Sequence, residues 1–337
     1  MLLQTSYKEK MNQEIMNQLN LFAENVQTIR KDFIWNHMGT KRLAALLYTL
    51  EGKAIDCDAI RQSYNLIKER KGVFSMFRGN MSLFIAAMLS LDDGCQQRLD
   101  DVSEVYDLLK AEKFSASDYL AVAAYLIVAD TEREHYQRVV LRSRLFYEGM
   151  RKNNRWHTGQ DDYIFAVMLG LSDIDDTFGT GRVQELFERL RPEFRMAGAN
   201  SVQALAQMLT LGGKSDEALG HLLLLRNTLR SRRIKLDRAY TLPALGALSL
   251  LSVDGHSLVE DLLEAQRFLR SQRGFGSFSI STQELLLFSS AIISSIYAKD
   301  LNDAIVSSTS VSIINIIIAQ QIAMIIAVTA ASTAASS

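Results

Sequence analysis

The chain has very little proline and very little cysteine. Pro192 and Pro243 are its only prolines in 337 residues, so few positions would break a long helix. Cys57 and Cys95 are its only cysteines, and their spacing fits neither a zinc site nor a disulfide framework. These two shortages favour a folded, helix-rich protein in a reducing cytoplasm.

The chain also lacks an excess of charge of either sign. It has 37 lysine and arginine residues against 38 aspartate and glutamate residues, which gives a formal net charge of −1. This balance provides no overall attraction for nucleic acid, so such a role would need a local patch. Residues 1–16 lack a basic segment followed by an apolar one, so we expect no secretory signal.

Signatures of catalysis are missing as well. The sequence contains no GxSxG, Walker A or Rossmann motif, and its five histidines include no HExxH pair. The acidic segment 172–176 lacks the glycine and the final glutamate of a calcium-binding hand. We therefore cannot nominate a catalytic nucleophile, and we predict no metal and no cofactor.

What the chain does contain is a recurring helical pattern. Apolar residues at positions i, i+3, i+4 and i+7 recur about every forty residues, the scale of tandem helix pairs. The pattern occurs over 43–50, 84–91, 120–127, 164–171, 202–209, 242–249 and 285–292. Further helical patterns lie between these segments, as over 102–109 and 183–190. We predict an all-α fold of about seven antiparallel helix pairs forming an α/α superhelix, with a closed α/α toroid as the alternative.

The first helix of each pair is rich in small residues, such as Ala44, Ala45, Ala86 and Ala87. Small side chains let helix backbones approach closely, so we expect these helices inside and the bulkier, more charged helices outside. The predicted parts are an N-terminal capping helix over 1–38, a repeat domain over 39–300, and an apolar C-terminal helix over 301–337, packed on the last repeat.

Residues 311–331 form an apolar segment long enough to span a bilayer. However, Asn315, Gln320 and Gln321 lie inside it, and no lysine or arginine follows it. We expect a helix that is buried among other helices. Membrane contact through this segment is the alternative.

The segments that lead into the inner helices share a local pattern. Phe74, Phe114, Trp156 and Phe275 are each followed by Ser, Thr, Asp or Asn shortly before a helix. An apolar residue ahead of such a capping residue packs back on the helix as a hydrophobic staple. We therefore expect these aromatic side chains to pack against the helices that follow.

Three stretches carry a resemblance to a known family. They are GQDDYIFAVMLGLSD from Gly159, FGSFSISTQELLL from Phe275 and IIIAQQIAMIIA from Ile316. On these stretches the chain resembles an uncharacterised bacterial family, domain of unknown function 4003, over most of its length. The resemblance implies a helical bacterial protein and brings no activity with it.

The densest polar cluster in the sequence is a candidate site. It comprises Trp156, His157, Asp161, Asp162 and Tyr163, which offer a base, two carboxylates and an aromatic surface at a helix start. A purely structural reading is also open, because carboxylates stabilise the positive end of a helix dipole. Adjacent carboxylates on a helix point in different directions, which argues against a shared substrate bond.

Charges divide between the two ends of the helix pairs. Basic residues collect where the outer helices end, and acidic residues collect where inner helices lead into outer ones. Helix dipoles alone favour this layout by about 0.3–1 kcal/mol per charge, and the alternative is that the basic rim receives an anionic partner. The candidate anion-binding rim is Arg151, Lys152, Arg155, Arg230, Arg232, Arg233, Lys235, Arg270 and Arg273.

From the sequence we expect a non-catalytic helical-repeat binding or scaffold protein whose partner is another protein or an anionic polymer. The alternative is an α/α-toroid enzyme with acids in a central cavity, where Asp118, Asp161, Asp162 and Glu284 begin inner helices. A third possibility is a membrane-associated protein held by 311–331. The sequence carries no strong signal for nucleic acid.

Overall fold

The computed structural model describes residues 2–72, 75–213, 215–251 and 253–304. This part of the chain forms fourteen α-helices and four single-turn 3-10 helices, without a strand, which confirms the all-α prediction. The outer helices are α1 (Leu2–Asp32), α3 (Cys57–Arg70), α5 (Cys95–Ala111), α7 (Tyr136–Asn153), α9 (Asp176–Leu190), α11 (Ser215–Ser231) and α13 (Gly255–Ser271). The inner helices are α2 (Met38–Leu50), α4 (Ser82–Ser90), α6 (Asp118–Asp130), α8 (Tyr163–Leu171), α10 (Ala199–Leu211), α12 (Leu242–Ser249) and α14 (Thr282–Ala304). The single turns are η1 (Met76–Arg78), η2 (Arg133–His135), η3 (Gln160–Asp162) and η4 (Ala239–Thr241).

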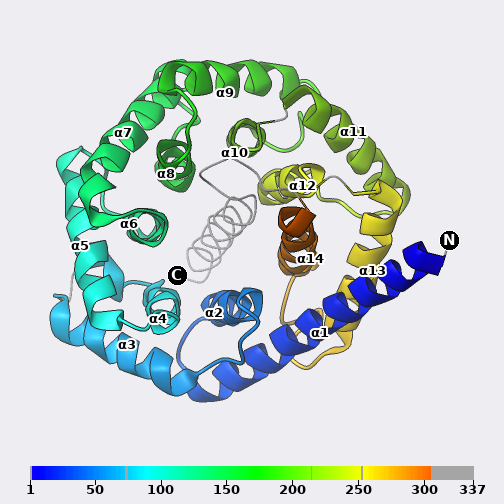
Figure 1. The fold of residues 1–337 in the computed structure, drawn as a ribbon, viewed down its shortest axis with the longest axis horizontal. Helices are drawn as coiled ribbons and strands as arrows, with labels where there is room; N and C mark the ends of the chain where they lie inside the picture. The colour runs from blue at the N-terminus through cyan, green and yellow to red at the C-terminus, as the bar shows by residue number, and fades with distance from the viewer. Residues whose placement is uncertain (1, 73–74, 214, 252, 305–337) are drawn as a thin grey trace.

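The inner helices begin close to where the apolar pattern predicts them, and they form an inner ring (Figure 1). Small residues allow this crowding. A Cβ atom added to Gly170 of α8 would lie 2.9 Å from the backbone nitrogen of Ser143 and 3.1 Å from the carbonyl oxygen of Val139, both in α7. The inner position expected for the helices rich in small residues is therefore confirmed.

Three outer helices, α3, α9 and α13, start at a capping aspartate. The carboxylate of Asp56 accepts hydrogen bonds from the amides of Asp58 and Ala59 at the start of α3. Asp175 accepts one from the amide of Phe178 in α9, at 2.9 Å. Such caps satisfy amides that have no partner within the helix and favour the start of these helices at the capping residue.

The first and last helix pairs touch, so the helices close into a ring (Figure 1). The ring of Phe22 in α1 lies 5.3 Å from that of Phe288 in α14 and 5.5 Å from that of Phe275. Arg42 of α2 donates hydrogen bonds to the carbonyl oxygens of Gly274 and Ser279, at 3.0 and 2.8 Å. The tandem pairs therefore form the closed α/α toroid that the sequence left open as an alternative.

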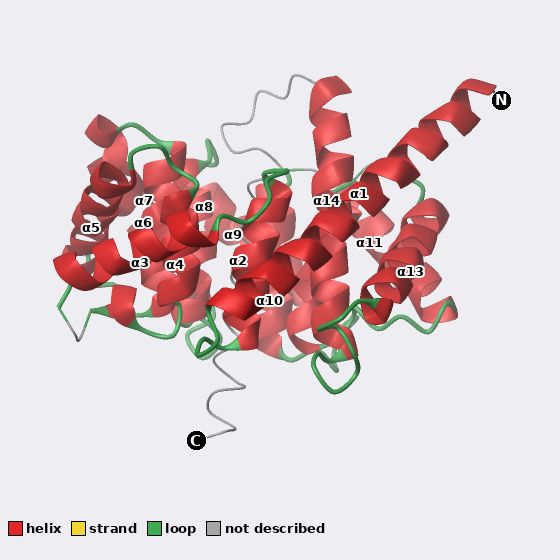
Figure 2. Cartoon of the chain, turned by 90° about the horizontal axis from the view of Figure 1, so that it is seen from below, coloured by secondary structure: helices red, strands yellow, loops and turns green. Residues whose placement is uncertain are grey.

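Loops emerge at the two ends of the helices and form two opposite faces (Figure 2). We call the face where outer helices lead into inner helices the outer-to-inner face, and the opposite one the inner-to-outer face. Every outer helix carries a lysine or arginine in its last turn, whereas none of the inner helices does within the described residues. The predicted concentration of basic residues at one end of the pairs is thus present.

Of the two helices predicted at the ends of the chain, the N-terminal one lies within the described residues. Helix α1 packs against α2, α13 and α14 as a full member of the outer ring. Of the apolar helix predicted over 301–337, only residues 301–304 are described, as the end of α14. The segment 311–331 lies wholly outside the described residues. None of the helices in the described ranges combines the length and hydropathy that a membrane span needs.

Candidate functional site

The predicted polar cluster lies on the outer-to-inner face, between α7 and α8. Trp156 stands in the loop after α7 with 89% of its surface exposed, while Asp161 and Asp162 belong to the single turn η3 that precedes α8. The ring of His157 lies 6.1 Å from that of Phe187. Tyr163 is buried, and its hydroxyl accepts a hydrogen bond from the amide of Ser115 at 3.1 Å.

Asp162 is the most deeply buried carboxylate of this cluster, and the chain itself supplies its partners. Its oxygens accept hydrogen bonds from the amide of Gly159 at 2.8 Å and from the side-chain amides of Gln203 and Gln207 at 3.0 and 2.6 Å. Burial, and next the charge of Asp161, raise the pKa of Asp162 to about 7. Asp162 is therefore poised between its charged and neutral forms near neutral pH.

Gln203 and Gln207 were not predicted as part of the cluster. Both belong to α10 and are fully buried. The signal in the sequence is a pair of glutamines four residues apart within an otherwise apolar inner helix, which places both side chains on one helix face. Buried amides in such a position need hydrogen-bonding partners, and the carboxylate of Asp162 is one that both share.

Three of the four acids predicted to begin inner helices lie near one another. Burial raises the pKa of Tyr119, and the charges of Asp161, Asp118 and Asp162 raise it further. Burial also raises the pKa of Asp118 and of Asp161. Carboxylates from the starts of α6 and α8 therefore share one electrostatic environment around Tyr119.

Glu284, the fourth predicted acid, has a local role at the start of α14. Its carboxylate accepts hydrogen bonds from the amide and the hydroxyl of Ser281, at 3.2 and 3.0 Å. The hydroxyl of Ser281 in turn accepts a bond from the amide of Glu284 at 3.1 Å. This is a capping box, in which the carboxylate stabilises the helix terminus.

The nine residues of the candidate basic rim divide into two groups. Arg230 forms an ion pair with Asp237 at 2.5 Å, and Arg232 forms one with Glu260 at 2.5 Å. Arg270 donates hydrogen bonds to the carbonyl oxygens of Phe275 and Ile280. Within the described part of the chain, the rim residues that form neither an ion pair nor a side-chain hydrogen bond of this kind are Arg151, Lys152, Arg155, Arg233, Lys235 and Arg273.

The same face carries exposed apolar side chains. Trp35 is 97% exposed in the loop between α1 and α2, and Met196 is 79% exposed between α9 and α10. Phe278, between α13 and α14, is fully exposed. Trp156 belongs with them, so the staple predicted for it is wrong, whereas Phe114 and Phe275 are buried as expected. Phe74 lies outside the described residues.

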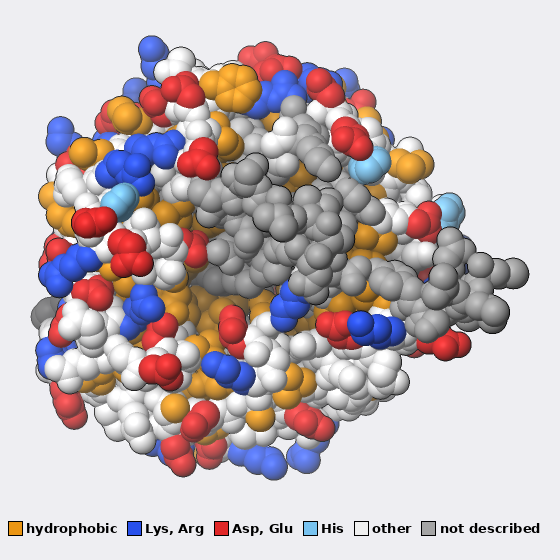
Figure 3. Space-filling view, viewed as in Figure 1, with side chains coloured by type: hydrophobic (Ala, Val, Ile, Leu, Met, Phe, Trp, Pro, Cys, Tyr) orange, Lys and Arg blue, Asp and Glu red, His pale blue; other side chains and the backbone are white. Residues whose placement is uncertain are grey.

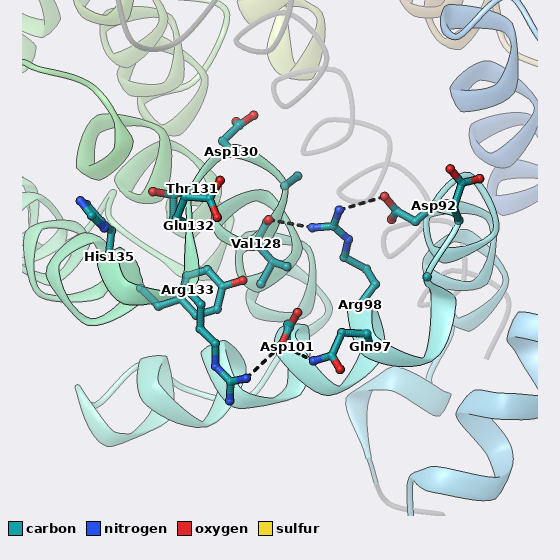
Figure 4. Close-up of a pocket in the computed structure, with 14 residues that line it drawn as sticks. Asp92, Gln97, Arg98, Asp101, Val128, Asp130, Thr131, Glu132, Arg133 and His135 are labelled. Carbon is teal, nitrogen blue, oxygen red and sulfur yellow. Dashed lines mark hydrogen bonds and ion pairs between the residues drawn. The ribbon is translucent and has the colours of Figure 1, made fainter.

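A groove of about 1050 Å³ opens on the inner-to-outer face, between the α4–α5 and α6–α7 junctions (Figure 4). Arg98 spans it by donating hydrogen bonds to the carbonyl oxygen of Val128 and to Asp92, at 2.7 and 3.1 Å. Arg133 forms ion pairs with Glu104 and Asp101. Both guanidinium groups are thus used to join neighbouring repeats. The carboxylates that line the groove belong to Asp92, Asp93, Asp101, Asp130 and Glu132.

Charged side chains of both signs are spread over the face of the molecule that Figure 3 shows. In the view along the short axis, acidic and basic side chains of both signs surround the face, and hydrophobic side chains show deeper toward the centre (Figure 3). The unpaired cations and exposed aromatic residues of the outer-to-inner face are therefore the part of the described surface best suited to an external partner.

Comparison with known proteins supports one assignment. No curated protein and no solved structure matches the chain. Residues 25–323 match a protein family, and this range covers the junctions and the inner and outer helices from α2 to α14. Because the match spans well over half of its residues, the chain belongs to the family described as "Protein of unknown function (DUF4003)".

Proposed function

We propose that this protein is a non-catalytic, ring-shaped binding or scaffold protein of the bacterial cytoplasm, which receives an anionic partner on its outer-to-inner face. The observation that carries the proposal is the set of exposed, unpaired cations at the ends of successive outer helices. Arg155, Arg233 and Arg273 come from three different helix junctions. Because the junctions follow one another around a closed ring, the cations of several junctions together form a basic surface on one face.

The electrostatic argument follows from this arrangement. The chain has a net charge near zero, so its attraction for an anion must come from an uneven distribution of charge. The positive charge of a cation that forms no ion pair is not neutralised by a neighbouring carboxylate. The electrostatic potentials of several such cations add up at the surface. The partner's affinity should then fall steeply as salt screens the interaction.

The test is binding of a soluble polyanion, heparin, measured by calorimetry over a range of salt concentrations. We expect binding at low salt that weakens as salt rises, and weaker binding for the double variant Arg233→Glu/Lys235→Glu. The matched control is Lys53→Glu/Arg138→Glu, because Lys53 and Arg138 are exposed on the inner-to-outer face. Equal loss in both double variants, or no binding at low salt, would contradict the proposal.

A second candidate function, an α/α-toroid enzyme, is supported by the acids around Tyr119. The pKa of Asp162 is raised to about 7, and the pKa values of Asp118 and Asp161 are also raised; such clustering is frequent in active sites. Against it, both oxygens of Asp162 already accept bonds from the chain. Turnover in a hydrolase substrate panel that is lost in Asp118→Asn/Asp161→Asn would favour the enzyme.

A further inference from the structure

Exposed apolar side chains, here called apolar tips, occur together with exposed cations along consecutive loops of the outer-to-inner face. Passing round the ring, the loop after α7 presents Trp156, the loop after α9 presents Met196, and the loop after α13 presents Phe278. Ring closure brings the loop after α1, with Trp35, next in the series. The loop between α11 and α12, which lies between those with Met196 and Phe278, is basic. We call the consecutive loops from the one after α7 to the one after α1 the arc.

The two tryptophans of the chain are both on this arc. Trp35 and Trp156 are the only tryptophans in the sequence, and they are 97% and 89% exposed. A single exposed apolar residue needs no explanation, but several on one face do. Tryptophan and phenylalanine side chains are favoured at the boundary between water and lipid, where the ring leaves bulk water without entering the hydrocarbon core.

The basic residues of the arc fit the charge of such a boundary. Arg155 precedes Trp156, Arg195 precedes Met196, and Arg273 lies five residues before Phe278. All three are exposed and form no ion pair within the described ranges. A basic residue beside an inserted apolar one is positioned to contact an anionic headgroup while its neighbour enters the interface.

The loop between α11 and α12 adds a basic hollow to the arc. A pocket of about 430 Å³ is lined there by Arg233, Lys235 and Arg238, together with the ion pair between Arg230 and Asp237. Three exposed cations around a small hollow can hold a phosphate group. The hollow lies on the same face as the apolar tips, between the loops that carry Met196 and Phe278.

The spread of these residues favours a flat partner over a small ligand. The tips come from four different junctions of the ring, and a closed ring presents its loops around one face rather than into one pocket. We propose that the outer-to-inner face docks on the surface of an anionic lipid bilayer, with Trp35, Trp156 and Phe278 entering the interface and the neighbouring cations contacting lipid phosphates. This inference rests on the proposed function above and names its anionic partner.

The experiment uses the full chain and vesicles of phosphatidylcholine, with and without phosphatidylserine. Binding is measured by co-sedimentation and by tryptophan emission, which reports only Trp35 and Trp156. We expect binding to the anionic vesicles alone, with emission moving to shorter wavelength as the indoles leave water. Each exposed cation removed should weaken binding about fivefold, and Trp35→Ser/Trp156→Ser should weaken it at least about tenfold.

The matched control is Phe178→Ser, because Phe178 is exposed at the start of α9 on the inner-to-outer face. It should bind as the wild type does, and circular dichroism should show each variant folded. Vesicle binding that survives the double tryptophan substitution, or leaves tryptophan emission unchanged, would overturn the inference. Heparin binding without vesicle binding would overturn it but leave the proposed function standing, whereas binding to neither would contradict both.

Discussion

At the scale of single residues, Asp162 shows how burial and hydrogen bonding oppose each other. The three amides that donate to its carboxylate favour the charged form, but complete burial and the nearby charge of Asp161 favour the neutral form more strongly. The sequence identified Asp162 as part of a polar cluster, yet it could not supply Gln203 and Gln207. Those partners come from another repeat, more than forty positions further along the chain.

A pH dependence of stability follows from Asp162. Its folded pKa of about 7 lies above the ordinary value near 3.9 expected in the unfolded chain. The unfolded state therefore binds fewer protons between these values, and stability falls as pH rises from about 4 to about 7. We expect urea denaturation to show this loss as a free energy of unfolding that is lower at pH 7 than at pH 4, by on the order of a few kcal/mol.

The variants Asp162→Asn and Asp173→Asn separate this effect from a general acid response. Asparagine at position 162 cannot ionise, so the decline between about pH 4 and about pH 7 should become smaller, while the raised pKa values of Asp118 and Asp161 preserve part of it. Asp173 is exposed in the loop after α8, and its substitution should leave the decline intact. A profile that is equally steep in the wild type and in Asp162→Asn would show that another group controls the dependence.

At the scale of elements, the inner helices depend on close backbone approach. Gly170→Ala should lower the free energy of unfolding by about 1–3 kcal/mol, because the added methyl group meets the backbone of α7 at Ser143 and Val139. Gly220→Ala in α11 is the control, since a Cβ atom there meets nothing within 4 Å. That variant should gain roughly 0.5–1 kcal/mol from better helix propensity. Chemical denaturation of both variants measures the difference, and equal effects would contradict the packing argument.

The positions of the helices were the most predictable feature of this structure. The spacing of apolar residues located the inner helices, because a helix buried on its inner side must repeat apolar residues at helical period. The orientation of the aromatic side chains at the junctions was harder to predict. Phe114 and Phe275 pack inward while Trp156 points into solvent, and the local sequence patterns ahead of the helices are alike. Orientation there depends on neighbouring repeats, which a local pattern does not contain.

At the scale of the whole molecule, ring closure rests on contacts between residues far apart in sequence. Arg42 is almost fully buried and bonds to Gly274 and Ser279, and burial lowers its pKa to about 10 while the charge of Glu284 acts in the opposite direction. A helical period cannot show that these segments meet, because an open superhelix and a closed ring share the same repeat. Ring closure could therefore be recognised only from the structure.

Because the ring is closed, contacts between the first and the last repeat should contribute to the stability of the entire fold. Phe22 is fully buried and contacts Phe275 and Phe288 from the last repeat. Phe22→Ala should lower the free energy of unfolding by about 3–5 kcal/mol, and unfolding should remain a single transition because no repeat is terminal. Phe178→Ala, at an exposed position, should change it little. A Phe22→Ala variant as stable as the wild type would contradict the closed ring.

The central claim, that an anionic partner occupies the outer-to-inner face, is tested most directly by acrylamide quenching of Trp35 and Trp156. These are the only tryptophans in the chain, and both are exposed on that face. Saturation with an anionic partner, either heparin or anionic vesicles, should protect them from the quencher, and added salt should restore access. A bound partner that leaves both tryptophans as accessible as in the free protein would show that it binds elsewhere.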